Sequence, residues 1–192
     1  ENGEQLPDSP MKGGVVIFAA GNEGVAQGYP ASYPGCIAVS ATTGSFGLAY
    51  YSNFGSWVDI AAPGGDLSRR HGIYSTINDN SYDSMQGTSM ACPHVSGIAA
   101  LALAYAEQMG KTYSVKQMQT ILLTSVNNLN MYLHDQQKRI QPETLEEYNM
   151  AKYYNKVGTG SIDAFRVLMA VRGTVCVPVV AGEENVIKIS SL

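Results

Sequence analysis

The stretch QGTSMACPHVSG, residues 86–97, decides the fold of this chain. Ser89 follows a glycine and a threonine and opens a run of small and apolar residues, and no Asp, Glu, Lys or Arg occurs between positions 87 and 106. This run is long enough for a membrane span, but Pro93, His94 and its many small residues favour a helix crowded on every side by protein. We therefore predict a buried central helix that begins near Ser89.

Short apolar runs that end in glycine or polar residues surround this helix. Residues 15–21 (VVIFAAG) and 36–42 (CIAVSAT) have the continuous apolar composition of strands buried on both faces of a parallel sheet. Residues 57–65 add a short strand that a Pro-Gly pair ends. Residues 72–76 are expected to pair with residues 82–85 across a polar turn. These elements predict an α/β fold.

Three helices are predicted in the second half of the chain. Residues 114–126 begin with a capping box, Ser114 and Gln117, and carry apolar residues at helical spacing. A peripheral helix is predicted over residues 142–154, with a proline in its first turn. A final amphipathic helix is predicted over residues 161–172.

Composition excludes several classes of function. The chain has 192 residues, of which 45% are hydrophobic and 15% charged, as expected of one compact domain. Its net charge of −4 gives no basic face for nucleic acid and no basic patch for an anionic membrane. Three cysteines without a CxxC pair support neither a disulfide framework nor a zinc site. The residues themselves therefore predict no metal and no required cofactor.

Ser89 is a candidate nucleophile. A serine hydroxyl becomes nucleophilic when a base removes its proton, and the unpaired N–H groups at a helix start favour developing negative charge. A serine at this position also fits a simple N-cap. Asn22, in GNEG directly after the first apolar run, would stand at the carboxyl edge of the sheet, where α/β proteins gather their sites. Asn-Glu-Gly is also an ordinary turn, so Asn22 alone decides nothing.

Taken together, these motifs resemble the carboxyl-terminal part of the catalytic domain of a subtilisin-like serine protease, a subtilase. GTSMACPHVSGIAAL (87–101) resembles the nucleophile motif of that family, and VVIFAAGNEG (15–24) resembles the strand and loop that carry its oxyanion asparagine. Residues 28–43 and 51–64 resemble the two segments that follow in order. VGTGSIDAFRVLMAV (157–171) resembles the closing helix of the family.

The resemblance implies a three-layer α/β fold, with helices on both faces of a mostly parallel sheet that is truncated at its amino-terminal side. It implies that Ser89 attacks a peptide substrate to form an acyl-enzyme, and that Asn22 and the Ser89 N–H bind the oxyanion. Gly21, Glu23 and Gly28 match positions that border the pocket for the substrate side chain before the scissile bond. Glycine at these positions is expected to leave room for a large side chain.

The aspartate and histidine motifs of the family do not occur in this sequence. His94 lies five residues after Ser89, which places it roughly 140° around the helix axis, away from the hydroxyl. His71 lacks the context of the family motif, and His134 and Asp135 are chain neighbours, which rarely point at one another. We therefore expect this chain to be part of a longer serine endopeptidase and to be inactive alone. The alternative is a non-catalytic subtilase-like module that binds peptide or scaffolds a partner.

The expected organisation follows from this resemblance. Residues 1–172 are expected to form the carboxyl-terminal part of the catalytic domain, with a surface insertion at about residues 127–156. Residues 173–192 alternate like two strands and predict a β-rich tail or the start of an appended module. The main expected partners are a peptide or protein substrate and the missing amino-terminal half. The sheet edge that this half would cover predicts self-association.

Two further expectations rest on the resemblance alone. Relatives hold a weak calcium or sodium ion through backbone carbonyls in the stretch that matches Ala31, Tyr33 and Cys36. Relatives are also secreted, which predicts an extracellular or cell-envelope location.

Overall fold

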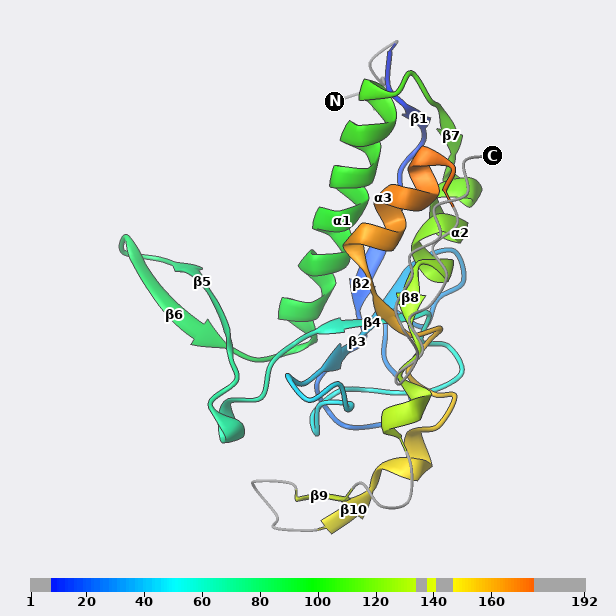
Figure 1. Ribbon diagram of the computed structural model, residues 1–192. Helices are drawn as coiled ribbons and strands as arrows, with labels where there is room; N and C mark the ends of the chain where they lie inside the picture. The colour runs from blue at the N-terminus through cyan, green and yellow to red at the C-terminus, as the bar shows by residue number, and fades with distance from the viewer. Residues whose placement is uncertain (1–7, 134–137, 141–146, 175–192) are drawn as a thin grey trace, which may run out of the picture.

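The central sheet has five strands in the order β2-β3-β4-β11-β8 in the computed structural model, which describes residues 8–133, 138–140 and 147–174 (Figure 1). Strands β2, β3, β4 and β11 run parallel, and β8 is antiparallel to β11. The bounds of these strands are Ile17–Ala19 (β2), Ile37–Thr42 (β3), Ile60–Pro63 (β4), Ser161–Ile162 (β11) and Val126–Asn127 (β8). The expected α/β fold with a mostly parallel sheet is confirmed.

The remaining elements surround this sheet. Three α-helices are described, α1 (Thr88–Gln108), α2 (Val115–Thr124) and α3 (Ala164–Arg172). Three short 3-10 helices are η1 (Leu67–Arg69), η2 (Asn130–Tyr132) and η3 (Met150–Tyr153). Three further strand pairs join β1 (Met11–Lys12) to β7 (Tyr113–Ser114), β5 (Ile73–Ile77) to β6 (Ser81–Met85), and β9 (Lys138–Ile140) to β10 (Glu147–Asn149).

The two faces of the sheet are covered differently. All six residues of β3 are buried, as its continuous apolar sequence predicts. Alternate side chains of β3 and β4 pack with the three α-helices in one core cluster, which includes Ile37, Val39, Ala41, Ile60, Ala62, Val95, Leu122 and Val167. Ala61 points to the other face and packs in a second cluster with residues of η3 and with Leu129 and Leu133 on either side of η2.

Strand β2 is less buried than its sequence predicts. Val16 and Phe18 keep 50% and 37% of their surface exposed. The prediction of a strand buried on both faces is therefore wrong for the described residues. The reason is position, because β2 is the last strand of the sheet and no strand in the described ranges pairs with its outer edge.

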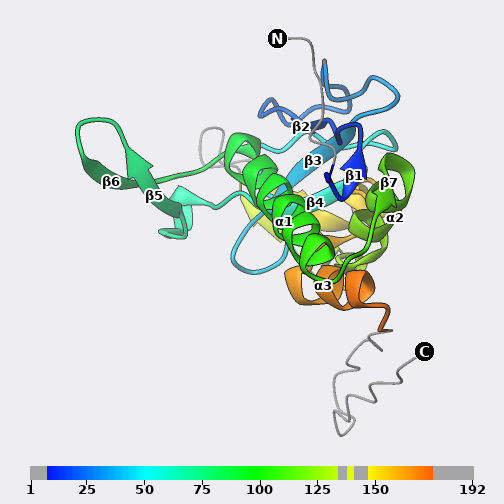
Figure 2. The ribbon, with the colours of Figure 1, turned by 90° about the horizontal axis from the view of Figure 1, so that it is seen from above.

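Helix α1 is confirmed, but its predicted burial on every side is wrong. It packs on the sheet through one stripe of small residues that includes Ala91, Val95 and Ala99, whereas Leu101 on another side is 48% exposed. Only 28% of the most apolar 18-residue window of α1 is buried inside the structure. By length and composition alone this helix could cross a membrane. Figures 1 and 2 show the reason for the low burial, since none of the drawn elements covers the outer side of α1.

The hairpin of β5 and β6 is confirmed; β5 is shifted by one residue from the predicted range, and β6 begins one residue earlier than predicted. The connection has three residues, 78–80, and Asp79 and Asn80 adopt φ of 59° and 53°, the left-handed region that Asn and Asp tolerate better than most residues. Tyr74 and Tyr82 stack across the strands with ring centroids 5.8 Å apart. The hairpin extends away from the body of the molecule next to the start of α1 (Figure 1).

Helix α2 begins with the predicted capping box. The Ser114 hydroxyl accepts from the backbone N–H of Gln117, and the Gln117 side chain accepts from the backbone N–H of Ser114. We expect Ser114→Ala to lower the free energy of unfolding by about 1 kcal/mol, because one N–H at the helix start loses its acceptor. Urea denaturation measures this, with the exposed Thr112→Ala as the control. Equal stabilities of the two variants would contradict the role of the cap.

Two helix predictions need correction. Within the predicted helix over 142–154, the described part forms β10 and η3, because β10 pairs with β9 and the side chains of η3 enter the second core cluster. Helix α3 begins at Ala164 instead of Ser161, because β11 joins the sheet and Asp163 caps the helix by accepting from the Arg166 N–H. The predicted tail beyond residue 174 lies outside the described residues.

Candidate active site

Asn22 and Thr88 join the end of β2 to the start of α1. The carboxamide oxygen of Asn22 accepts from both the backbone N–H and the hydroxyl of Thr88, at 2.8 Å each. The Thr88 hydroxyl in turn accepts from the backbone N–H of Gly21 at 3.1 Å. Two residues that are 66 positions apart in the chain are thereby held in contact, next to Ser89.

This contact places two hydrogen-bond donors close to the open space beside Gly87. Within the described residues no hydrogen bond occupies the Asn22 Nδ2 atom or the Ser89 backbone N–H. A Cβ atom added to Gly87 would lie 3.5 Å from the first and 3.6 Å from the second. Gly87 has φ of 151°, which only glycine adopts readily, and its missing side chain keeps this space open. Two donors that converge on open space are the geometry that stabilises an oxyanion.

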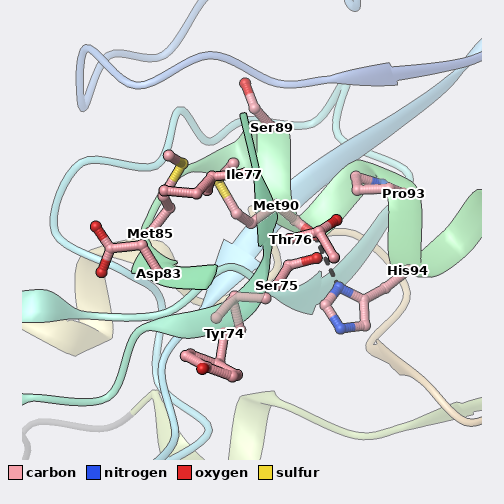
Figure 3. Close-up of a pocket in the computed structure, with 11 residues that line it drawn as sticks. Tyr74, Ser75, Thr76, Ile77, Asp83, Met85, Ser89, Met90, Pro93 and His94 are labelled. Atoms are coloured by element: carbon pink, nitrogen blue, oxygen red, sulfur yellow. Dashed lines mark hydrogen bonds between the residues drawn. The ribbon is translucent and has the colours of Figure 1, made fainter. Parts of the chain in front are cut away.

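Ser89 is exposed and lies in the first turn of α1. It lines a cavity of about 380 Å³ between the first turns of α1 and the β5–β6 hairpin. Figure 3 shows its hydroxyl at one end of this cavity, pointing away from the imidazole of His94. An exposed hydroxyl at a helix start, next to two free donors, can perform acyl transfer once a base is supplied.

The described histidines do not supply this base. His94 Nδ1 lies 2.7 Å from the backbone oxygen of Met90 on the preceding turn, so this ring nitrogen is used within α1. His71 lies in the loop before β5, where its ring packs beside Gly44. His134 and Asp135 lie outside the described residues.

Tyr51 holds the segment 64–65, which contacts the residue before helix α1. Its hydroxyl donates to the backbone oxygens of Gly64 and Gly65 at 2.8 and 2.9 Å. The Gly64 oxygen also accepts from the Gly87 N–H at 2.9 Å. Burial raises the pKa of Tyr51 well above its ordinary value. The phenol therefore stays protonated and keeps donating these hydrogen bonds, which hold the end of β4 against the turn before Ser89.

Asn53 organises the loop that carries Asn22, and the sequence analysis missed it. Its side chain is buried and donates to the Ala20 oxygen (2.9 Å), the Glu23 carboxylate (2.7 Å) and the Gln27 oxygen (3.2 Å). Its oxygen accepts from the N–H groups of Glu23 and Val25 at 3.1 and 3.0 Å. A polar residue inside the motif YSNFG is the one sequence signal that pointed to it.

Asn53 also changes the explanation of two glycines. A Cβ on Gly21 would meet the Asn53 amide nitrogen at 2.4 Å, and a Cβ on Gly28 would meet the Ala20 oxygen at 2.3 Å and the Asn53 nitrogen at 3.0 Å. The lack of a side chain at these two positions is thus explained by packing inside the loop, and their role beside a substrate side chain stays a prediction. Asn53 and, beside Gly28, Trp57 already fill that space. Glu23 is exposed as a residue, although its carboxylate accepts from the Asn53 amide.

The stretch matched to a cation site makes a different contact. The Cys36 thiol lies 3.3 Å from the Ala31 oxygen and 3.0 Å from the Tyr33 oxygen, so the two carbonyls accept from sulfur. Calcium prefers six to eight oxygen ligands, and an ion here would have to displace the thiol. A calcium or sodium ion on these carbonyls stays a prediction, and the described residues contain no cluster of three acidic, His or Cys side chains that could hold a metal.

Comparison with known proteins assigns the family. The model of the subtilase family, a family of serine peptidases, matches residues 5–160. The chain is 53% identical over 91 residues to the thermophilic serine proteinase of Bacillus sp. (strain AK1), an alignment that covers 47% of this chain and 21% of that protein. It is 35% identical over 140 residues to the extracellular basic protease of Dichelobacter nodosus, covering 68% of this chain and 22% of that protein.

A solved structure agrees with this assignment. A protease of Pseudoalteromonas arctica PAMC 21717 superposes with a TM-score of 0.61 and 30% identity, covering 82% of this chain and 42% of that chain. The present chain thus spans about a fifth of the length of the two curated relatives and less than half of the solved one. The family match over most of the described fold shows that this chain belongs to the subtilase family of serine proteases.

Proposed function

We propose that this chain supplies the nucleophile and the oxyanion donors of a secreted serine endopeptidase. The base removes the proton from the Ser89 hydroxyl as its oxygen attacks the peptide carbonyl. The tetrahedral oxyanion is held by Asn22 Nδ2 and the Ser89 N–H. The base then protonates the leaving amine, and water hydrolyses the ester on Ser89. The observation that carries this proposal is the Asn22–Thr88 contact, which holds the donor amide beside Ser89.

The base and the aspartate that orients it are proposed to come from a segment outside these 192 residues. Three features support a docking place for such a segment. They are the outer edge of β2, which pairs with no strand in the described ranges, the exposed side of α1, and the cavity that Ser89 lines. The chain covers only 21% and 22% of the two curated relatives, so most of each relative lies outside the matched part.

The substrate and the location follow as parts of the same proposal. The substrate is a peptide or protein, and Gly21, Glu23 and Gly28 belong to the loop that borders the residue before the scissile bond. Glu23, as the exposed carboxylate of this loop, is the group that would contact that residue. The name of the Dichelobacter nodosus relative describes an extracellular protease, which supports an extracellular or cell-envelope location.

Without the completing segment, we propose that the chain self-associates. The outer edge of β2, which is unpaired as far as the structure describes the chain, offers backbone groups to a second copy, and α1 packs next to β2. A two-stranded hairpin alone is marginally stable, so β5 and β6 also gain from a partner. Addition of the completing segment should convert the self-associated chain into a one-to-one complex.

A reconstitution experiment tests the proposal. The chain is mixed with a subtilase segment that carries the Asp and His motifs, and three signals are measured: turnover of a chromogenic peptide, labelling by a fluorophosphonate probe and mass by light scattering. We expect turnover and labelling only in the mixture, with a shift to the one-to-one mass. A stable one-to-one complex without labelling would contradict the proposal and favour the non-catalytic peptide-binding module. Turnover by the chain alone would contradict its dependence on the segment.

A further inference from the structure

The loop from Asp66 to His71 is a closed, basic projection beside the site. Its ends are tied by two backbone hydrogen bonds between these two residues, at 2.8 and 3.0 Å. Arg70 adopts φ of 59°, which is uncommon for a residue with a side chain and persists where the surrounding structure holds it. The closed loop therefore holds the backbone at Arg70 in this conformation.

The charges of this loop leave Arg70 unbalanced. Asp66 is 3% exposed, its carboxylate accepts from the Ser68 hydroxyl, and it lies 3.8 Å from the Nε atom of Arg69. Arg70 is exposed, and across the described ranges its guanidinium has no recorded ion pair or hydrogen bond. Asp66 thus pairs with Arg69, and the positive charge of the loop that has no partner in the part of the chain that the structure describes is that of Arg70.

Arg70 and His71 line a cavity of about 410 Å³, which we call the Arg70 cavity. Thr42, Gly44 and Ile73 also line it. Ile73 also lines the cavity of Ser89, so the two cavities adjoin at this residue. The described lining residues of the Arg70 cavity include no acidic side chain, so an anionic ligand meets no carboxylate there.

The same loop is tied to the segment that leads into Ser89. The Leu67 N–H donates to the Gln86 side chain at 2.7 Å, and the Gln86 amide donates to the Tyr50 hydroxyl at 2.8 Å. Gln86 precedes Ser89 by three residues. The loop of Glu23, in contrast, reaches the start of α1 through Asn22. Two different loops therefore approach Ser89, one acidic through Glu23 and one basic through Arg70.

We propose that the Arg70 cavity binds the carboxylate of an Asp or Glu side chain in the substrate, within the residues that follow the scissile bond. This inference rests on the proposed function. If the preceding residue lies at the Glu23 loop and the scissile carbonyl at Ser89, the following residues run toward the hairpin and the Arg70 cavity. A guanidinium suits this role because its donors match the two oxygens of a carboxylate. His71 contributes a second polar group.

Peptide binding measures this preference without requiring catalysis. Two fluorescein-labelled decapeptides are compared, identical except for Glu or Gln at the second and third positions after the intended scissile bond. Fluorescence anisotropy with the full chain should give roughly three- to fivefold tighter binding of the Glu peptide, the range of an exposed charge pair. The preference should disappear in about 1 M salt because exposed charges are screened there.

Three variants separate Arg70 from the overall charge. Arg70→Asn removes the charge with a residue that tolerates positive φ and should abolish the preference. Arg70→Glu should reverse the preference, so that a third decapeptide with Lys at the same two positions binds more tightly than the Glu peptide. Lys116→Glu makes the same change of charge on the exposed side of α2 and should leave the preference intact. Equal affinities for the Glu and Gln peptides, absence of binding of either, or an unchanged preference in Arg70→Asn would overturn the proposal.

The outcome is separable from that of the proposed function. Hydrolysis by the reconstituted protein without a preference for acidic residues would overturn the role of Arg70 alone. A Glu preference in binding that depends on Arg70, together with no hydrolysis after reconstitution, would support the Arg70 cavity and contradict the catalytic proposal.

Discussion

Ser89→Ala should abolish peptide hydrolysis by the protein that has been completed with its base and aspartate, with a loss in kcat of about six orders of magnitude. The reason is that the acyl-enzyme ester forms on the Ser89 oxygen, so alanine removes the atom that makes the new bond. This magnitude is the one known for subtilisin, a member of the same family, and is not a result of the geometry described above. Turnover of a chromogenic peptide and labelling by a fluorophosphonate probe measure the loss.

The matched control for this variant lies on the same helix. Ser96 is exposed on α1 and its hydroxyl donates to the Cys92 oxygen at 3.3 Å. Ser96→Ala should keep full turnover and labelling. Circular dichroism and the one-to-one mass of the complex establish that Ser89→Ala is folded and assembled. Hydrolysis that survives in Ser89→Ala at the level of Ser96→Ala would remove Ser89 from the mechanism.

Asn53→Leu is expected to destabilise the chain by about 4 kcal/mol, because the substitution leaves several buried or half-buried polar groups without partners. The affected groups are the backbone oxygens of Ala20 and Gln27, the backbone N–H groups of Glu23 and Val25, and the Glu23 carboxylate. Such a loss is a large share of the ordinary stability of a domain. Urea denaturation followed by circular dichroism gives the free energy of unfolding.

An exposed asparagine provides the comparison. Asn128 accepts one hydrogen bond, from the Asn130 N–H at 2.9 Å, and lies on the surface. Asn128→Leu should cost no more than about 1 kcal/mol. If both variants lose the same stability, Asn53 does not organise the loop of Asn22 and Glu23. Hydrogen exchange should locate the loss in Asn53→Leu at residues 20–28.

Elements with local causes were predictable. The capping box of Ser114 and Gln117 depends on groups three residues apart, and the β5–β6 turn depends on residues that tolerate positive φ. Strand β3 was predictable because a continuous apolar run has few alternatives to a buried parallel strand. Helix α1 and the position of Ser89 in its first turn follow from the motif in the same local way.

Elements with distant causes were not predictable from local pattern. The helix expected over residues 142–154 gives way in its described part to β10 and η3, because pairing with β9 and burial of Met150 and Tyr153 outweigh local propensity. The exposure of Phe18 and of Leu101 depends on which neighbours cover β2 and α1, and residue patterns do not contain that information.

The same distinction between local and distant causes applies to the candidate site. The sequence by itself determined the family, the α/β class, and the two residues, Ser89 and Asn22, that carry the proposed chemistry. Only the tertiary structure decided that Thr88 holds the Asn22 amide beside Ser89, that Asn53 fills the space beside Gly21 and Gly28, and that Arg70 faces a cavity adjoining that of Ser89. The physical reason is that hydrogen bonds between residues 30 to 66 positions apart form only when strands and helices pack together. No fixed spacing in the sequence marks the two partners of such a bond.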